Sequence, residues 1–152
     1  MEITEVRIKL VADLDDRLRA FCSITFDGEF VVRDLKIIEG IRGHFVAMPS
    51  RKLMEKCNRC SAKNDVKAKF CSHCGSRLPE NRLARGDGGK PRLFADIAHP
   101  INAACRDRIE ATVIAAFENE MQLAQKPGYV CRYDDYDEAA QRSMSANFGH
   151  ER

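Results

Sequence analysis

Four cysteines in two Cys-x-x-Cys pairs are the residues of this chain best suited to chemistry. The first pair is Cys57 and Cys60, the second is Cys71 and Cys74, and ten residues separate the pairs. Two tight turns of this kind bring four thiolates around one ion, and zinc takes four soft ligands in a tetrahedron. The spacing therefore predicts a zinc ribbon over residues 55–78 that holds one structural Zn²⁺.

Two disulfides or four idle thiols are the alternatives, and one pair alone would equally suit a redox dithiol. Gly75 directly follows the second pair and relaxes its turn, which favours the metal site. His73 lies inside that turn and is also a metal-ligand type, but four cysteines suffice. The remaining cysteines, Cys22, Cys105 and Cys131, are scattered as expected of reduced thiols in a cytoplasm.

Positive charge is concentrated around the predicted ribbon. Residues 51–92 contain twelve Lys and Arg against four Asp and Glu, a net charge of +8, whereas the rest of the chain carries thirteen against nineteen. Such a concentration is typical of a surface that binds a polyanion. The alternative is a solvated, lysine-rich surface around a zinc module.

The candidate nucleic-acid contacts are the cations of this segment. Lys and Arg displace counterions from phosphates and give an affinity that falls steeply with salt. Lys63 belongs to the same cluster, and Phe70 is a candidate for base stacking, although a place in the ribbon's own small core is the favoured role. The candidate contacts are Arg51, Lys52, Lys56, Arg59, Lys67, Lys69, Arg77, Arg82, Arg85, Lys90 and Arg92.

Length and composition allow one ordinary core plus a metal-held module. Of the 152 residues, 44% are hydrophobic and 32% are charged, which is typical of a soluble globular protein. The N-terminus lacks the regions of a secretory signal, and no apolar run reaches the roughly 18 residues that a membrane helix needs. We therefore expect a cytoplasmic protein without a membrane partner.

No residue pattern typical of an enzyme is found. The sequence has no phosphate-binding glycine loop, no nucleophile elbow and no His-Glu-x-x-His helix. His99 near Asp96 favours a structural hydrogen bond over a catalytic pair. Asp134, Asp135 and Asp137 lie in an acidic tail with nothing predicted to hold them, and we expect this tail to compete with nucleic acid for the basic segment.

The elements that position these residues are predicted to be short strands followed by one helix. Apolar and polar residues alternate in the strands, Asp27-Gly28 is a hairpin turn, and Arg33-Asp34 interrupts the third strand as a bulge would. Asn102 is a candidate N-cap for a helix from Ala103 to about Gln125. The predicted strands cover residues 3–11, 18–26, 29–38, 44–48 and 92–98.

These elements predict an α+β fold, an antiparallel meander sheet packed with a C-terminal helix, with the zinc ribbon inserted. Without the ribbon, the strands of Phe45 and Phe94 would be the two arms of one hairpin. A small sheet with an exposed edge favours self-association, so we expect a homodimer. The predicted parts are a discontinuous core of residues 1–52 and 90–126, the ribbon at 55–78, a flexible basic linker at 79–89 and an acidic tail at 127–152.

Several motifs in these strands and at the start of the helix occur in the same order as in a known protein family. They are Glu5-Val6-Arg7-Ile8, Leu18-Arg19-Ala20, Ser23-Ile24-Thr25-Phe26, Glu29-Phe30-Val31-Val32-Arg33-Asp34, Ile37-Ile38-Glu39-Gly40, Gly43-His44-Phe45-Val46-Ala47-Met48-Pro49-Ser50 and Phe94-Ala95-Asp96-Ile97-Ala98-His99-Pro100-Ile101-Asn102. The chain thereby resembles the septation protein SpoVG family over about residues 1–52 and 90–121. The resemblance implies a small bacterial regulator that binds DNA, and in some cases RNA, as a dimer.

Two features depart from the family pattern. Members usually join the Met-Pro-Ser strand to the Asp-Ile-Ala-His-Pro strand by a short basic loop, where nucleic-acid contact is placed, and here that loop holds the ribbon. The acidic tail after Lys126 is the second addition. The prediction is a cytoplasmic bacterial nucleic-acid-binding regulator whose basic ribbon extends the contact surface. The alternative is an adaptor whose ribbon docks a protein partner, and the regulated process, whether sporulation, septation or another, is left open.

Overall fold

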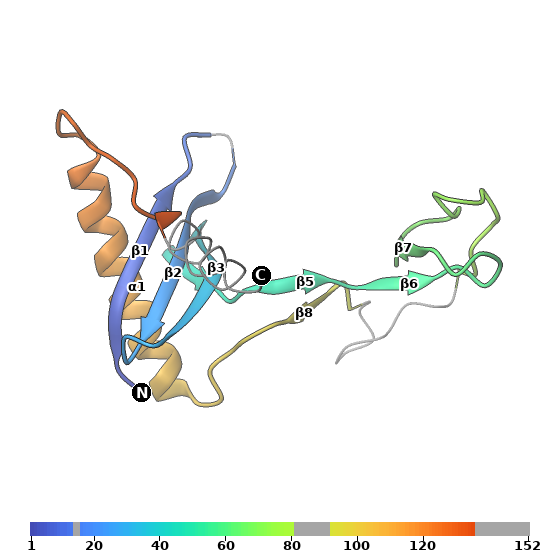
Figure 1. Ribbon diagram of the computed structural model, residues 1–152, viewed down its shortest axis with the longest axis horizontal. Helices are drawn as coiled ribbons and strands as arrows, with labels where there is room; N and C mark the ends of the chain where they lie inside the picture. Colours follow the sequence, from blue (N-terminus) through green and yellow to red (C-terminus); the bar gives the residue numbers. More distant parts are fainter. Residues whose placement is uncertain (14–15, 81–91, 136–152) are drawn as a thin grey trace, which may run out of the picture. The chain divides into compact units, whose positions relative to one another are not determined.

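The chain folds into two compact units, Met1–Pro49 with His99–Arg152, and Ser50–Ala98. The structure is a computed structural model (Figure 1) that describes residues 1–13, 16–80 and 92–135. The first unit, called the core unit below, contains the sheet and the helix, and the second, called the inserted unit, contains the cysteine pairs. Most of the predicted linker and the tail from residue 136 onwards lie outside the described residues.

One antiparallel sheet of four strands forms the core unit, in the order β1-β2-β3-β4. Consecutive strands pair with one another, so the predicted meander and the α+β class are confirmed. The alternation of apolar and polar residues follows from one sheet face being buried. The strands are β1 (Ile3–Leu10), β2 (Leu18–Phe26), β3 (Phe30–Gly40) and β4 (Gly43–Ala47).

The predicted turn and bulge are both present. Asp27 and Gly28 have φ angles of 52° and 68° and are the central residues of a tight turn in which the Glu29 amide donates to the Phe26 carbonyl at 3.0 Å. Phe26 pairs with Phe30, so the hairpin loop has three residues. The pairing of β2 with β3 shifts its register opposite Asp34, whose φ of 64° is tolerated because a short Asp side chain reaches the left-handed region more readily than most. The bulge also positions Tyr133, whose hydroxyl contacts Asp34 as described below.

The helix α1 (Ala103–Leu123) packs its apolar stripe on the sheet. Ile109, Val113 and Phe117 are buried in the same cluster as the inward-facing residues of the strands. The Asn102 side chain caps the helix by accepting a hydrogen bond from the Cys105 amide at 2.8 Å. The predicted helix and its cap are therefore confirmed, with the helix ending two residues earlier than expected.

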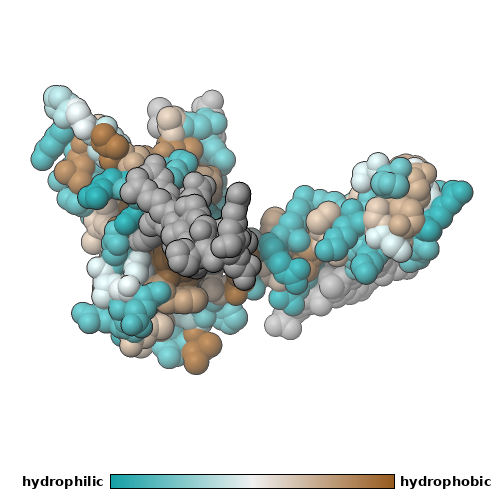
Figure 2. Space-filling model, viewed as in Figure 1, coloured by the Kyte–Doolittle hydropathy of each residue, from teal (hydrophilic) through white to brown (hydrophobic). Residues whose placement is uncertain are grey.

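Two short strand pairs make up the regular part of the inserted unit. β5 (Ser50–Lys52) pairs with β8 (Phe94–Asp96), and β6 (Met54–Lys56) pairs with β7 (Lys63–Asp65). Most of the visible surface of this unit is hydrophilic (Figure 2).

The predicted hairpin between the strands of Phe45 and Phe94 is wrong. Phe45 pairs with Ile38 in the core sheet, whereas Phe94 pairs with Lys52 of β5. Pro49 lies between β4 and β5 and has no amide hydrogen to donate, so the ladder of β4 ends before the insertion begins. The strand pair next to the insertion point therefore belongs to the inserted unit.

The expectation that nothing holds the start of the acidic tail is also wrong. Tyr133 is only 4% exposed, and Asp134 forms ion pairs with Lys9 and Arg33 of the core sheet. Asp135 pairs with Arg132. Asp137 lies outside the described residues.

Candidate functional site

Four thiols converge in the inserted unit. The sulfur atoms of Cys57, Cys60, Cys71 and Cys74 all lie within 4.8 Å of one another. The Sγ atoms of Cys57 and Cys74 are 3.7 Å apart and those of Cys60 and Cys71 are 3.6 Å apart. These separations exceed a disulfide bond of about 2.05 Å, and all four cysteines are free. They match the edge of about 3.8 Å of a tetrahedron whose metal–sulfur bonds are about 2.3 Å. The cluster can therefore hold a metal ion.

The two Cys-x-x-Cys turns have the same backbone geometry. In the first, the Ser61 amide donates to the Cys57 carbonyl at 2.9 Å; in the second, the Gly75 amide donates to the Cys71 carbonyl at 3.0 Å. Ser61 and Gly75 have positive φ angles of 62° and 74°. The sequence identified the special conformation at Gly75 but not at Ser61, because serine gives no local signal for it.

Backbone amides and one side-chain amide point at the Cys71 sulfur. Hydrogen bonds from the Cys74 amide, the Asn64 side chain and the His73 amide lower the pKa of Cys71 to about 5. Each of these bonds favours the thiolate, the form that binds a metal. His73 therefore contributes its backbone, and its imidazole is not needed in a four-sulfur cluster.

The pKa of the Cys57 thiol is also lowered. A hydrogen bond with the Ser76 hydroxyl, followed by bonds from the Cys60 and Arg59 amides, lowers the pKa of Cys57. The pKa of Cys60 moves the other way, to about 11: the Ala62 amide lowers it, but burial and the neighbouring thiols outweigh that effect.

Asn64 supports the second turn, and sequence reasoning missed it. This residue of β7 is only 3% exposed, and its Nδ2 donates to the Cys71 sulfur at 3.4 Å and to the Ala62 carbonyl at 3.1 Å. Its Oδ1 accepts from the Ser72 amide at 2.9 Å. Asn64 thus links the strand after the first turn to the second turn, a role that only the folded chain reveals.

Phe70 lies outside the small core of the ribbon, so the favoured core role is wrong. Its side chain is 60% exposed, whereas the buried residues of this unit's cluster are Cys57, Cys71 and Leu78. Phe70 forms an isolated strand bridge with Arg77 and lines an open groove of about 280 Å³. The groove also contacts Lys67, Lys69, Leu78 and Pro79.

The predicted cations are exposed wherever the structure describes them. Lys52 forms an ion pair with Asp65, and this partner lowers the pKa of the Asp65 carboxyl. Arg77 pairs with Glu80 at 3.3 Å, with both side chains at least three-quarters exposed. Arg82, Arg85 and Lys90 lie outside the described residues. The exposed set is Arg51, Lys52, Lys56, Arg59, Lys63, Lys67, Lys69, Arg77 and Arg92.

Across the described ranges, no helix combines the length and the apolar character needed to cross a membrane. The only long helix found there, α1, carries charged residues along its exposed face.

Comparison with known proteins places both the sheet and the helix in one family. The SpoVG family profile matches residues 1–119. A SpoVG protein of Finegoldia magna is 37% identical over 122 residues, which are 80% of this chain and 79% of that protein. One of Clostridium acetobutylicum is 36% identical over 118 residues, or 78% of this chain and 85% of that protein. One of Anaeromyxobacter is 34% identical over 135 residues, or 89% of this chain and all of that protein. The chain therefore belongs to the SpoVG family.

Proposed function

We propose that this protein is a bacterial nucleic-acid-binding regulator whose inserted unit, folded around one structural Zn²⁺, extends the binding surface. It would act as a cytoplasmic homodimer without enzymatic activity, on DNA and also on RNA. The observation that carries the proposal is the convergence of four thiols in a unit that exposes many Lys and Arg side chains.

The donor set supports zinc as the ion. Four sulfurs at tetrahedral spacing, two of them with lowered pKa, suit an ion that prefers thiolates and has no geometric demand beyond four ligands. With Cys57, Cys60, Cys71 and Cys74 as ligands, no coordination position is left for water. Zinc bound there would supply folding energy rather than reactivity.

The charge and exposure of the inserted unit support nucleic acid as the ligand. Its nine described cations all face solvent, and only Lys52 and Arg77 among them form an ion pair found in the described residues. Phosphates attract such a surface by counterion release, with little dependence on sequence. Phe70 adds an exposed aromatic ring beside Lys67 and Lys69, an arrangement on which an unpaired base can stack.

Binding of random-sequence duplex and single-stranded oligonucleotides at low and high salt tests the proposal. The zinc-loaded protein is compared with a variant in which the four cluster cysteines are serine. We expect salt-steep binding by the first and a large loss in the second, because the cations lose their scaffold. Equal binding by the zinc-loaded protein and the serine variant would indicate that the nucleic-acid-binding surface lies on the core unit. No binding by either at low salt would reject the regulator function.

A protein-docking adaptor is the second candidate, and the groove beside Phe70 favours it. The groove is lined partly by apolar side chains, including Leu78 and Pro79, and a hydrophobic segment of a partner would fit there. The same binding experiment separates the two functions, since an adaptor of this kind would not bind random oligonucleotides in a salt-dependent way.

A further inference from the structure

The face of the core sheet that is opposite α1 carries basic side chains. Ile8 of β1 is buried in the core with α1, and the alternation of the strand places Arg7 and Lys9 on the opposite face. Arg7 pairs across the ladder with Ser23 of β2, and Ser23 is fully buried although it lies on this outer face. Something other than the helix therefore covers this part of the sheet.

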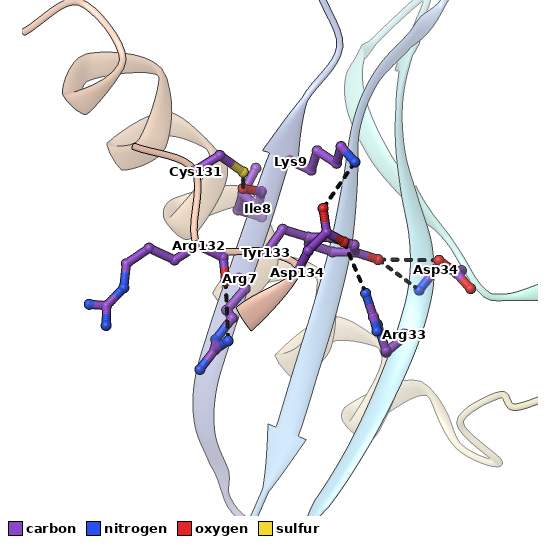
Figure 3. A network of polar contacts seen from close by, with 9 residues as sticks. All are labelled: Arg7, Ile8, Lys9, Arg33, Asp34, Cys131, Arg132, Tyr133 and Asp134. Carbon is purple, nitrogen blue, oxygen red and sulfur yellow. Dashed lines mark hydrogen bonds and ion pairs between the residues drawn. The ribbon is translucent and has the colours of Figure 1, made fainter. Parts of the chain in front are cut away.

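The cover is the C-terminal segment, defined here as residues 131–134 (Figure 3). The Arg132 carbonyl accepts a hydrogen bond from Arg7 at 3.1 Å, and Cys131 Sγ lies 3.6 Å from the Ile8 carbonyl. These residues follow the part of the chain that the family profile matches, residues 1–119. The segment therefore lies beyond the residues that the family profile matches and contacts a sheet that the profile covers.

Tyr133 anchors this segment at the bulge of β3. Its hydroxyl donates to the Asp34 carboxylate at 3.2 Å and accepts from the Asp34 amide at 3.3 Å. The ring is buried, and its centroid lies 5.1 Å from the Arg33 guanidinium and 6.0 Å from the Lys9 ammonium. Both cations are therefore held against one aromatic ring.

Asp134 bridges the same two cations. Its carboxylate oxygens lie 3.2 Å from Lys9 Nζ and 3.3 Å from Arg33 Nη2, and Figure 3 shows the side chain between them. The Asp134 side chain is 59% exposed and that of Lys9 is 50% exposed. The Arg33 side chain is 26% exposed. The pair with Lys9 is therefore weak and screened by salt, and the Asp134 side of the bridge is open to solvent, so a stronger anion can replace the carboxylate. Tyr133 can stay in place during that exchange because its anchors involve Asp34.

We propose that Lys9 and Arg33 form a phosphate-binding site on the sheet that Asp134 occupies until the backbone of a nucleic acid displaces it. Tyr133 holds the two cations in position, and Asp134 acts as a built-in competitor that lowers affinity. The site rests on the proposed function, since it takes the phosphates of the same ligand. It lies on the core unit and uses none of the cations of the inserted unit.

Asp134→Asn in the full-length, zinc-loaded protein tests the competitor. The probes are a 20-nucleotide single strand and inorganic polyphosphate. We expect at least about threefold tighter binding at low salt and a salt dependence steeper by about one phosphate contact or more. The matched control is Asp135→Asn, which removes the same charge one residue away, where the partner is the exposed Arg132.

A second set of variants locates the gained contact. In the Asp134→Asn background, Lys9→Gln and Arg33→Gln should each cancel most of the gain. Lys36→Gln, which changes an exposed cation of the same strand β3, should not. Circular dichroism confirms that each variant is folded. Cancellation by Lys9→Gln and Arg33→Gln alone would support the site.

The outcomes separate this inference from the proposed function. Equal affinities of Asp134→Asn and Asp135→Asn for both probes would overturn the site, while binding that depends on the four cluster cysteines would still uphold the proposed function. Tighter binding of polyphosphate without any binding of the oligonucleotide would overturn nucleic acid as the ligand of both surfaces.

Discussion

Asn64 is a side chain that supports the second cysteine turn. Its side-chain amide donates a hydrogen bond to the Cys71 sulfur and accepts one from the Ser72 amide. The residue is only 3% exposed. Mutation of a residue that hydrogen-bonds to a metal ligand typically lowers metal affinity about 10- to 100-fold. The buried amide therefore matters although it is not itself a ligand.

We predict that Asn64→Ala lowers zinc affinity about 10- to 100-fold, because the Cys71 sulfur and the Ser72 amide lose their partner. Competition with a chromophoric chelator measures the change. Asn58→Ala is the matched control, since Asn58 lies exposed in the first turn and should bind zinc as the wild type does. Equal affinities of the two variants would contradict the role of Asn64.

Phe70 should matter for unpaired bases and not for duplexes. We expect Phe70→Ala to weaken single-strand binding by roughly tenfold, since stacking on an aromatic ring contributes about 1–3 kcal/mol per base, and to leave duplex binding nearly unchanged. Fluorescence anisotropy with both oligonucleotides measures this difference. Phe94→Ala removes another exposed ring of the same unit, 56% exposed, and serves as the control. A uniform loss for both oligonucleotides would indicate a general disturbance of the ribbon.

At the scale of elements, α1 completes the core of the sheet, and Asn102 fixes where it starts. The cap satisfies a helix amide that has no partner within the helix, through a 2.8 Å bond to the Cys105 amide. Its side chain is exposed, so removing it disturbs no packing. The cap therefore tests local helix energetics alone.

Asn102→Ala should lower the free energy of unfolding of the core unit by about 1 kcal/mol, and Asn102→Ser should retain most of it, because the serine hydroxyl caps equally well. Urea denaturation followed by the helical circular dichroism signal measures both variants, since α1 is the only α-helix among the described elements. A loss as large for serine as for alanine would argue against capping as the cause.

At the scale of the molecule, the two units differ in how they are held together. The core unit has an eleven-residue buried cluster contributed by the sheet and α1, whereas the buried cluster of the inserted unit consists of Cys57, Cys71 and Leu78. So small a core rarely supports a fold without a metal or a cross-link. Metal binding and folding should therefore be coupled in the inserted unit and not in the core unit.

Chelation of the metal should unfold the inserted unit and leave the core unit intact. We predict that a strong chelator exposes residues between Ser50 and Ala98 to proteolysis, while the helical circular dichroism signal is kept. Acidification should act in the same direction, because protons compete with the metal for the thiolates. Loss of the helical signal at the same chelator concentration would show that the two units fold as one.

Self-association is expected through an edge of the core sheet. β1 and β4 are the two edge strands, and Phe45 of β4 is 40% exposed. Unpaired edges next to exposed apolar side chains favour pairing with a second copy. Light scattering at micromolar concentration should give twice the mass of one chain, 34.4 kDa for two chains of 17.2 kDa, and Phe45→Lys should shift it toward one chain. A monomeric wild type would reject the dimer.

The sequence by itself determined the features that depend on local chemistry or a regular period. Alternation located β1 to β3, Asp27-Gly28 located the turn, and the interruption at Arg33-Asp34 located the bulge, since each is set by a few neighbouring residues. The spacing of the four cysteines likewise predicted their convergence, because two tight turns restrict where the sulfur atoms can lie. The same holds for Asn102 and the helix that follows it.

Only the tertiary structure decided which distant segments meet. Pairing of Phe94 with Lys52, the exposure of Phe70 and the burial of Asn64 depend on how the turns pack, which no local pattern encodes. Asp134 reaches Lys9 across 125 residues of sequence. That contact exists because the chain folds back over the sheet after α1, and the choice of such a path is settled by many weak contacts acting together.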